Sequence, residues 1–136
     1  MDWSEFTWLL TALAAVEVFL TRLRLGKKSE LTSGRTAVST TLLTMHTSCG
    51  VIALALWVPG VATNHETLAF GGLGAWWLVT VAGLLLLTRW LPSHGKHSVG
   101  KVTDEWSEGP GLSLLAHLGM LCGALYFTFV VMTDRL

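Results

Sequence analysis

Apolar residues dominate four long stretches of the chain, and polar residues are concentrated in the segments between them. The four stretches run from about Phe6 to Leu23, from Thr36 to Val58, from Leu68 to Thr88 and from Pro110 to Thr133. Each comes close to the roughly 20 apolar residues that a helix needs to cross about 30 Å of hydrocarbon. Such helices satisfy every backbone polar group within one segment. The sequence therefore predicts an all-α fold, an integral membrane four-helix bundle that forms one domain over residues 1–136.

The composition supports a membrane protein and excludes some other classes. Hydrophobic residues make up 51% of the chain and charged residues only 13%, whereas soluble proteins contain about 25% charged residues. The formal net charge is zero at pH 7, so the chain lacks the basic field that attracts nucleic acid. We therefore expect the lipid bilayer to surround the helices and expect no nucleic-acid partner.

Basic residues are concentrated in two of the three segments that connect the apolar stretches. The first of these segments and its edge carry Arg22, Arg24, Lys27, Lys28 and Arg35, and the third carries Arg89, Lys96 and Lys101. Basic connecting segments usually face the cytoplasm. The sequence thus predicts that both chain termini lie outside, and we expect the protein in a bacterial cytoplasmic membrane.

Two histidines lie inside the second and fourth apolar stretches, which should cross the membrane in the same direction. His46 is eleven residues after Arg35, and His117 is nine residues after Glu108. At 1.5 Å per residue these positions lie about 16 Å and about 14 Å along their helices, so we expect both imidazoles at nearly one level. An ionisable side chain inside a membrane helix usually faces the bundle interior, a cavity or a cofactor. Two facing imidazoles at one depth are what a buried haem iron requires as axial ligands.

Small residues lie close to both histidines on their own helices. Gly50 is one turn after His46, and Ser113 is one turn before the second histidine, because positions four apart stack on a helix. A flat porphyrin approaches such faces easily, so both small residues are candidate cofactor-binding residues. Gly119 and Gly123 form a GxxxG pattern on a different face of the fourth helix, which predicts close packing against another helix.

The segment from His46 to Leu54, with the sequence His-Thr-Ser-Cys-Gly-Val-Ile-Ala-Leu, resembles a known pattern. It is similar to the H-x-x-x-G-x-x-A-L pattern of haem-bearing helices in small b-type membrane cytochromes, including b561-like proteins. The resemblance covers nine residues, and the helix of His117 lacks the matching glycine because Leu121 stands there. The resemblance implies haem b with His46 and His117 as its axial ligands. It also implies electron exchange with quinone, either by this chain alone or by the haem-bearing anchor subunit of a respiratory complex.

Two further polar residues are candidates for a proton or quinone site. Glu17 is the only acidic residue well inside a predicted span, and it either forms an ion pair with Arg22 or Arg24 or serves as a functional carboxylate. His65 lies in the connection between the second and third helices, where it is either a solvated residue or a hydrogen-bond partner for a quinone.

Two other functions remain compatible with these patterns. Histidines inside membrane helices also form hydrogen bonds between helices, so the chain is alternatively a cofactor-free accessory subunit of a larger respiratory or transport complex. A small proton-coupled carrier built around Glu17 and the histidines is the third possibility. The sequence contains no phosphate-binding loop, nucleophile elbow or zinc signature. We therefore expect no catalysis by the chain alone, although it is compatible with a subunit of an oxidoreductase complex that includes other membrane subunits.

Overall fold

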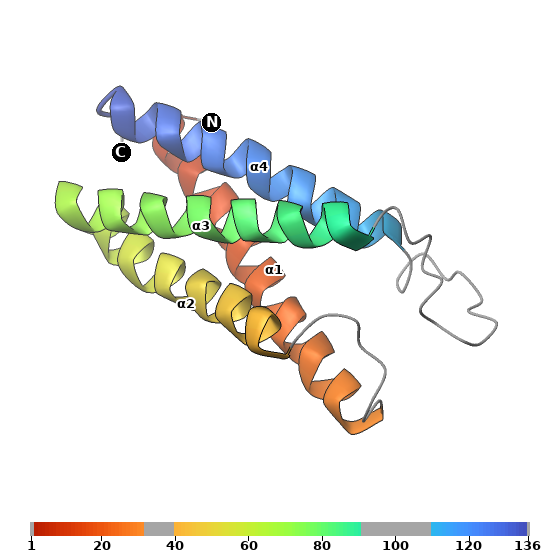
Figure 1. Cartoon of the computed structure of the whole chain (residues 1–136). Helices are drawn as coiled ribbons and strands as arrows, with labels where there is room; N and C mark the ends of the chain where they lie inside the picture. Colours follow the sequence, from red (N-terminus) through yellow and green to blue (C-terminus); the bar gives the residue numbers. More distant parts are fainter. Residues whose placement is uncertain (1, 32–39, 91–109, 136) are drawn as a thin grey trace.

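A computed structural model describes residues 2–31, 40–90 and 110–135, and all of its regular structure there is helical (Figure 1). The four helices are α1 (Trp3–Leu31), α2 (Thr40–Ala62), α3 (Glu66–Trp90) and α4 (Pro110–Met132). Each contains a segment long and apolar enough to cross a membrane. These segments are Trp3–Leu23, Thr44–Ala62, Glu66–Leu85 and Leu114–Met132. The predicted all-α fold with four candidate spans is therefore confirmed by helix length and composition.

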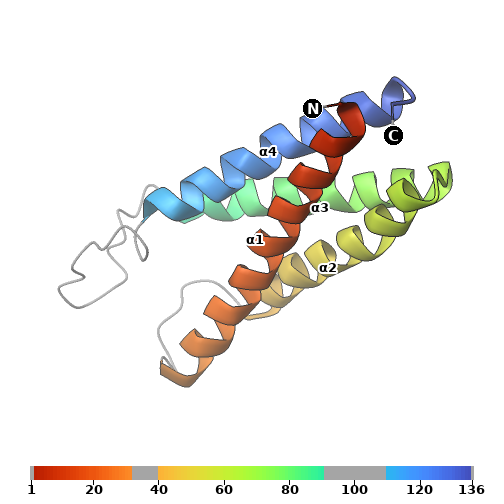
Figure 2. The same cartoon turned by 180° about the vertical axis from the view of Figure 1, so that it is seen from behind.

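The helices form a ring in which each packs against two neighbours. α2 packs on α3, α3 on α4, and α1 on both α2 and α4, whereas α2 and α4 lie diagonally opposite within the described ranges. α1 crosses obliquely, from the end of α4 to the start of α2 (Figures 1 and 2). We call the end of the bundle at which α1 and α3 begin, and at which α2 and α4 end, the terminal end. This arrangement brings the two histidine-bearing helices to face each other across the interior.

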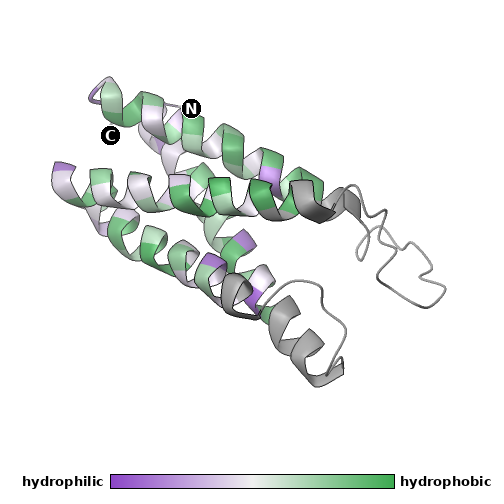
Figure 3. Cartoon of the chain, in the orientation of Figure 1, coloured by the Kyte–Doolittle hydropathy of each residue, from purple (hydrophilic) through white to green (hydrophobic). Residues whose placement is uncertain are grey.

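Large hydrophobic side chains cover the outside of the bundle. Figure 3 shows hydrophobic residues throughout the coloured part of each helix, with less hydrophobic residues between them. On α1 the exposed side chains include Leu13, Val16, Phe19 and Leu20, each more than half exposed. A helix that is hydrophobic all round is buried in a large protein or a membrane, so these surfaces are suited to contact with lipid.

Close packing of α2 on α3 depends on two glycines. A Cβ atom at Gly60 would lie 2.5 Å from the backbone nitrogen of Ala69, and one at Gly72 would lie 2.6 Å from the backbone nitrogen of Trp57. Both clashes would involve backbone atoms, which cannot rotate away as a side chain can. The two helices therefore approach each other closely only because these positions lack a side chain.

We expect Gly72→Ala to destabilise the bundle. Overpacking a tight contact costs about 1–3 kcal/mol, and here the added methyl group would meet the backbone of α2. Thermal unfolding in mild detergent measures the effect. Gly74→Ala is the matched control on the same helix, because nothing lies within 4 Å of a Cβ atom there. Equal melting temperatures for the two variants would show that the α2–α3 contact is looser than described.

One predicted span end is wrong. The sequence places the end of the second stretch at Val58, but α2 continues to Ala62 with Pro59 inside it. The turn that follows contains Asn64 with φ 49°, a left-handed conformation that asparagine tolerates. Proline is accepted within membrane helices because neighbouring groups compensate for the lost hydrogen bond. The helix α1 continues to Leu31, but its candidate membrane span ends at Leu23, as the sequence predicts.

Aromatic side chains fill the core toward the terminal end. Trp57 and Trp76 are fully buried, and the Trp57 ring centre lies 4.4 Å from that of Phe127. The Trp57 indole nitrogen donates a hydrogen bond to Thr11 Oγ1 at 2.9 Å, which ties α2 to α1. This core fills the terminal half of the bundle, and the histidines lie in the opposite half.

Candidate functional site

The structure brings His46 and His117 together between the diagonal helices α2 and α4. Their ring centres are 6.2 Å apart, and the ring planes differ by only 12°. His46 is six residues after the first residue of α2, and His117 is seven residues after the first residue of α4. The expectation that both imidazoles lie at one level is therefore confirmed by their contact. Both residues are half-buried, as expected for side chains that face the bundle interior.

The separation of the rings is suitable for two ligands of one metal ion. Bonds from a metal to a histidine nitrogen are about 2.0–2.1 Å long, and the ring centre lies roughly 1 Å beyond the nitrogen, so two such ligands place their ring centres about 6 Å apart. The observed value is 6.2 Å. In addition, His46 Nδ1 is buried and has no hydrogen-bond partner in the described part of the chain. A buried polar atom without a partner is costly unless something else satisfies it.

Gly83 of α3 supports the histidine pair from one side, and the sequence interpretation missed it. A Cβ atom at Gly83 would lie 2.6 Å from His117 Cδ2, 2.8 Å from His117 Nε2 and 3.1 Å from His46 Cε1. Both rings therefore lie against the α3 backbone, and glycine is needed for that approach. Gly83 is seven residues before the last residue of α3, so it lies at the histidine level. Counting residues from the same end of α2, α3 and α4 would have indicated that Gly83 lies at the level of the histidines.

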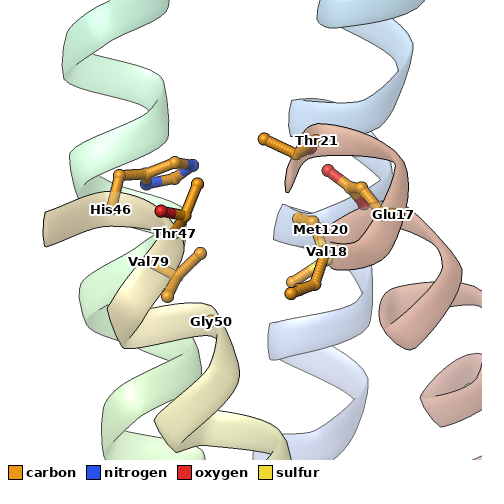
Figure 4. A pocket seen from close by; sticks show the side chains of 8 residues that line it. All are labelled: Glu17, Val18, Thr21, His46, Thr47, Gly50, Val79 and Met120. Atoms are coloured by element: carbon orange, nitrogen blue, oxygen red, sulfur yellow. The ribbon is translucent and has the colours of Figure 1, made fainter. Parts of the chain in front are cut away.

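A small cavity of about 30 Å³ lies on the side of the pair that faces α1. Its lining combines polar and apolar side chains from all four helices: Glu17, Val18, Thr21, His46, Thr47, Gly50, Val79 and Met120. Figure 4 shows Glu17 and Thr21 on one side of this space, with His46 and Thr47 on the other. A cavity of this size holds about one water molecule. The carrier hypothesis groups Glu17 with the histidines, and the structure places Glu17 and His46 around one cavity.

Glu17 does not form the ion pair that was considered with Arg22. Within the described side chains, the Arg22 Nη1 donates instead to Thr47 Oγ1 at 3.2 Å, and the Arg24 side chain lies outside the described residues. Positions 17 and 22 are five apart and so do not share a helix face as residues four apart do. The carboxyl group of Glu17 is consequently left on the cavity side of α1.

The structure places the remaining candidate residues in different surroundings. Gly50 is buried and lines the cavity, but a Cβ atom there would lie 3.0 Å from Val18 Cγ2, so it also permits close packing of α1. The side chain of Ser113 lies outside the described residues. His65 is exposed beyond the end of α2, where its Nδ1 accepts a hydrogen bond from the Leu68 backbone nitrogen at 3.5 Å. His65 and Glu17 therefore do not form one site.

The GxxxG pair of α4 faces away from the other described helices. Nothing lies within 4 Å of a Cβ atom at Gly119 or Gly123. The close helix packing predicted for these glycines is thus not made inside the described part of this chain.

Groups of three or more histidine, cysteine, aspartate or glutamate side chains that could hold a metal ion are absent from the described ranges. The two histidines are therefore an incomplete set for a bare metal ion, which usually has four or more ligands. They are a complete set for an iron ion whose other ligands come from a porphyrin. In comparisons with protein families, with characterised proteins and with solved structures, the chain matches none of them.

Proposed function

We propose that this chain binds haem b between His46 and His117 and transfers electrons within a membrane, in exchange with quinone. It acts either alone or as the haem-bearing anchor of a respiratory complex. The observation that carries the proposal is the 6.2 Å separation of two nearly parallel imidazole rings on diagonal helices. Support also comes from the buried His46 Nδ1, which has no partner among the described residues.

Each residue of the site has a distinct role in this proposal. His46 and His117 would hold the haem iron through their imidazole nitrogens, and two histidine ligands favour electron transfer over substrate binding. Haem iron supplies a one-electron reduction and oxidation when it is bound. Gly83 positions the two rings against α3, and the apolar residues Val79 and Met120 limit access of water to them. Ligand identity and the apolar surroundings together set the reduction potential.

The cavity beside the pair has to enlarge for a porphyrin to enter. Its volume of about 30 Å³ is well below the roughly 300 Å³ of the smallest typical ligand pockets. α1 is the helix best suited to move, because 17% of its span segment is buried compared with 39% for α3. The donor set thus fits haem in type and spacing, but the space around it does not. A porphyrin extends on all sides of its iron, and the α3 backbone at Gly83 lies against both rings, so α3 as well as α1 would have to move.

A haem-binding measurement tests this function. The chain is purified in mild detergent from cells supplied with a haem precursor, and its haem content and its oxidised and reduced visible spectra are recorded. We expect about one haem per chain, with the sharp α-band of a low-spin b-type haem after reduction. A folded, monodisperse and colourless protein that also fails to bind added haem would overturn the proposal.

The basic residues of the connecting segments support the proposed location in a bacterial cytoplasmic membrane. In a bacterial cytoplasmic membrane they would face the cytoplasm, so both termini would lie outside. The histidine pair would then lie closer to the cytoplasmic side, because it is within seven residues of the ends of α2 and α4 that follow these segments.

An accessory function without a cofactor is favoured by one observation. Among the described residues, nothing outside α4 lies within 4 Å of a Cβ atom at Gly119 or Gly123. Glycines spaced in this way allow a helix of another subunit to approach closely. If this is the main role, replacing both glycines with leucine would release a co-purifying subunit, and no variant would alter a visible spectrum.

A further inference from the structure

A carboxyl group and an imidazole share the small cavity beside the histidine pair. Glu17 of α1 and His46 of α2 both line it, and Figure 4 shows the two side chains pointing toward one another across the space. Both residues are half-buried, and Glu17 lies inside its candidate span, six residues before the end at Leu23. An acidic side chain inside a membrane segment is costly, and such groups typically mark a proton or ion pathway.

The cavity is suited to one water molecule that joins these two groups. Its volume of about 30 Å³ holds about one water. A buried water usually makes about three hydrogen bonds. Four polar side chains line the cavity: Glu17, Thr21, His46 and Thr47. His46 Nδ1 is buried and has no partner within the described ranges, so the imidazole has a ring nitrogen to offer to such a water.

Arg22 and His117 are ionisable groups that contact this lining from outside it. Arg22 Nη1 donates a hydrogen bond to Thr47 Oγ1 at 3.2 Å. The ring centre of His117 lies 6.2 Å from that of His46. The lining residues from α3 and α4 are apolar and do not titrate. Glu17 and His46 are therefore the two titratable side chains of the lining itself.

The size and the chemistry of the cavity favour a proton as its ligand. Groups of three or more histidine, cysteine or acidic side chains that could hold a metal ion are absent from the part of the chain that the structure describes. An organic ligand needs a pocket of roughly 300 Å³ or more, which a cavity of about 30 Å³ does not provide. A carboxyl group and an imidazole, in contrast, both bind and release protons.

We propose that Glu17 and His46 form a proton-binding site in which one proton is shared between them through the cavity water. In one state the carboxyl group carries the proton, and both side chains are neutral. In the other state the carboxyl group has donated its proton to the water while the water has donated one to the imidazole, so a carboxylate faces an imidazolium. The number of protons and the net charge are the same in both states. This inference goes beyond the proposed function and needs no haem.

The end of the bundle opposite the terminal end offers the shortest route for proton exchange. At 1.5 Å per residue, Glu17 lies about 9 Å from the end of its span at Leu23. His46 lies two residues after the start of its span at Thr44. Protons would therefore enter and leave at the end where α1 finishes and α2 begins.

The titration of His46 tests the proposal. The full chain is purified in mild detergent without added haem and with isotope-labelled histidine, and NMR follows each imidazole as the pH is varied. The His46 signal is the one that is missing from His46→Gln. We expect His46 to be protonated in two steps in the wild type, because the first proton is shared with Glu17. In Glu17→Gln we expect one step, with about tenfold lower affinity than the first step of the wild type, because an amide does not attract the imidazolium.

Two further variants separate this role from a general effect of charge or packing. Glu66→Gln is the matched control, because Glu66 is an exposed carboxyl group at the start of α3 and does not line this cavity. It should leave both steps of His46 unchanged. Val18→Ile adds a methylene group to the lining and so occupies the space of the water. It should remove the first step although Glu17 and His46 both remain, and it keeps the proposal testable if Glu17→Gln fails to fold.

Each contrary outcome has a distinct meaning. If Glu17→Gln leaves the titration of His46 unchanged, the two groups share no proton, and the proposal is overturned. If Glu66→Gln has the same effect as Glu17→Gln, the change comes from overall charge, and the proposal is again overturned. If Val18→Ile keeps both steps, the water does not carry the proton, which also contradicts the proposal. Because the test uses no haem, none of these results decides whether the chain binds haem, and a chain that fails to bind haem can still show the shared proton.

Discussion

Substitution of either His46 or His117 with alanine is expected to abolish the low-spin spectrum of the bound haem. The two rings lie at a spacing suited to one shared iron, so in the proposed function both imidazoles would hold it. In a variant with one histidine the iron would have one protein ligand fewer, and its reduced α-band would be broad and weak. The reduced-minus-oxidised spectrum and the haem content of both purified variants measure the effect. The double variant should contain no haem.

Two controls make this result specific. His65→Ala removes a histidine that lies in the exposed turn between α2 and α3, and it should leave the spectrum unchanged. Added imidazole should restore the low-spin band in the single variants, because a free ligand can occupy the space that the side chain leaves. Retention of a normal band by both single variants would show that the haem lies elsewhere, and the histidine contact would then be one of packing.

The four apolar stretches predicted the four candidate spans because helix length and hydropathy are local properties. The predicted end of the second stretch at Val58 was wrong because of contacts with another helix. α2 continues to Ala62 through Pro59 because it packs along α3, where Gly60 lies against the backbone of Ala69. Tertiary contacts of this kind compensate for a missing hydrogen bond, and a single segment of sequence does not display them.

Tryptophan residues show a second limit of sequence reasoning. Trp57 lies next to the predicted end of the second span, where indole rings usually form a belt at the membrane interface, whereas Trp76 lies inside the third span. The structure buries both completely in the core. The side of the helix that each tryptophan occupies depends on how α2, α3 and α4 are arranged around Phe127.

The candidate site was predicted in part. The common level of His46 and His117 follows from counting residues along two parallel helices, and the structure confirms it. The same count does not show that α2 and α4 are diagonal, which decides that the rings meet in the interior. It also does not show that Glu17 of α1 shares a cavity with His46. These relationships depend on the order of helices around the bundle, which hydropathy does not encode.

Gly83→Ala is expected to impair haem binding while the bundle remains folded. The added methyl group would lie 2.6 Å from His117 Cδ2, whereas ordinary contacts begin at about 3.4 Å. At least one ring would therefore have to move by about 0.8 Å, and metal sites accept deviations of only about 0.2 Å in ligand distance. We expect a loss of at least tenfold in haem affinity. Gly83→Val, with a larger side chain, should abolish binding.

The stability of this variant should change little, in contrast to Gly72→Ala. At Gly83 the clash would involve the ends of two imidazole side chains, which can rotate away, whereas at Gly72 it would involve the backbone of α2. Thermal unfolding of the haem-free proteins measures the first property, and titration with haem measures the second. Gly74→Ala, on the same helix but in open space, should alter neither. If Gly83→Ala binds haem as tightly as the Gly74→Ala control, haem binding does not depend on the contact of the two imidazole rings with Gly83. The described ring contact would then be a feature of the haem-free protein only.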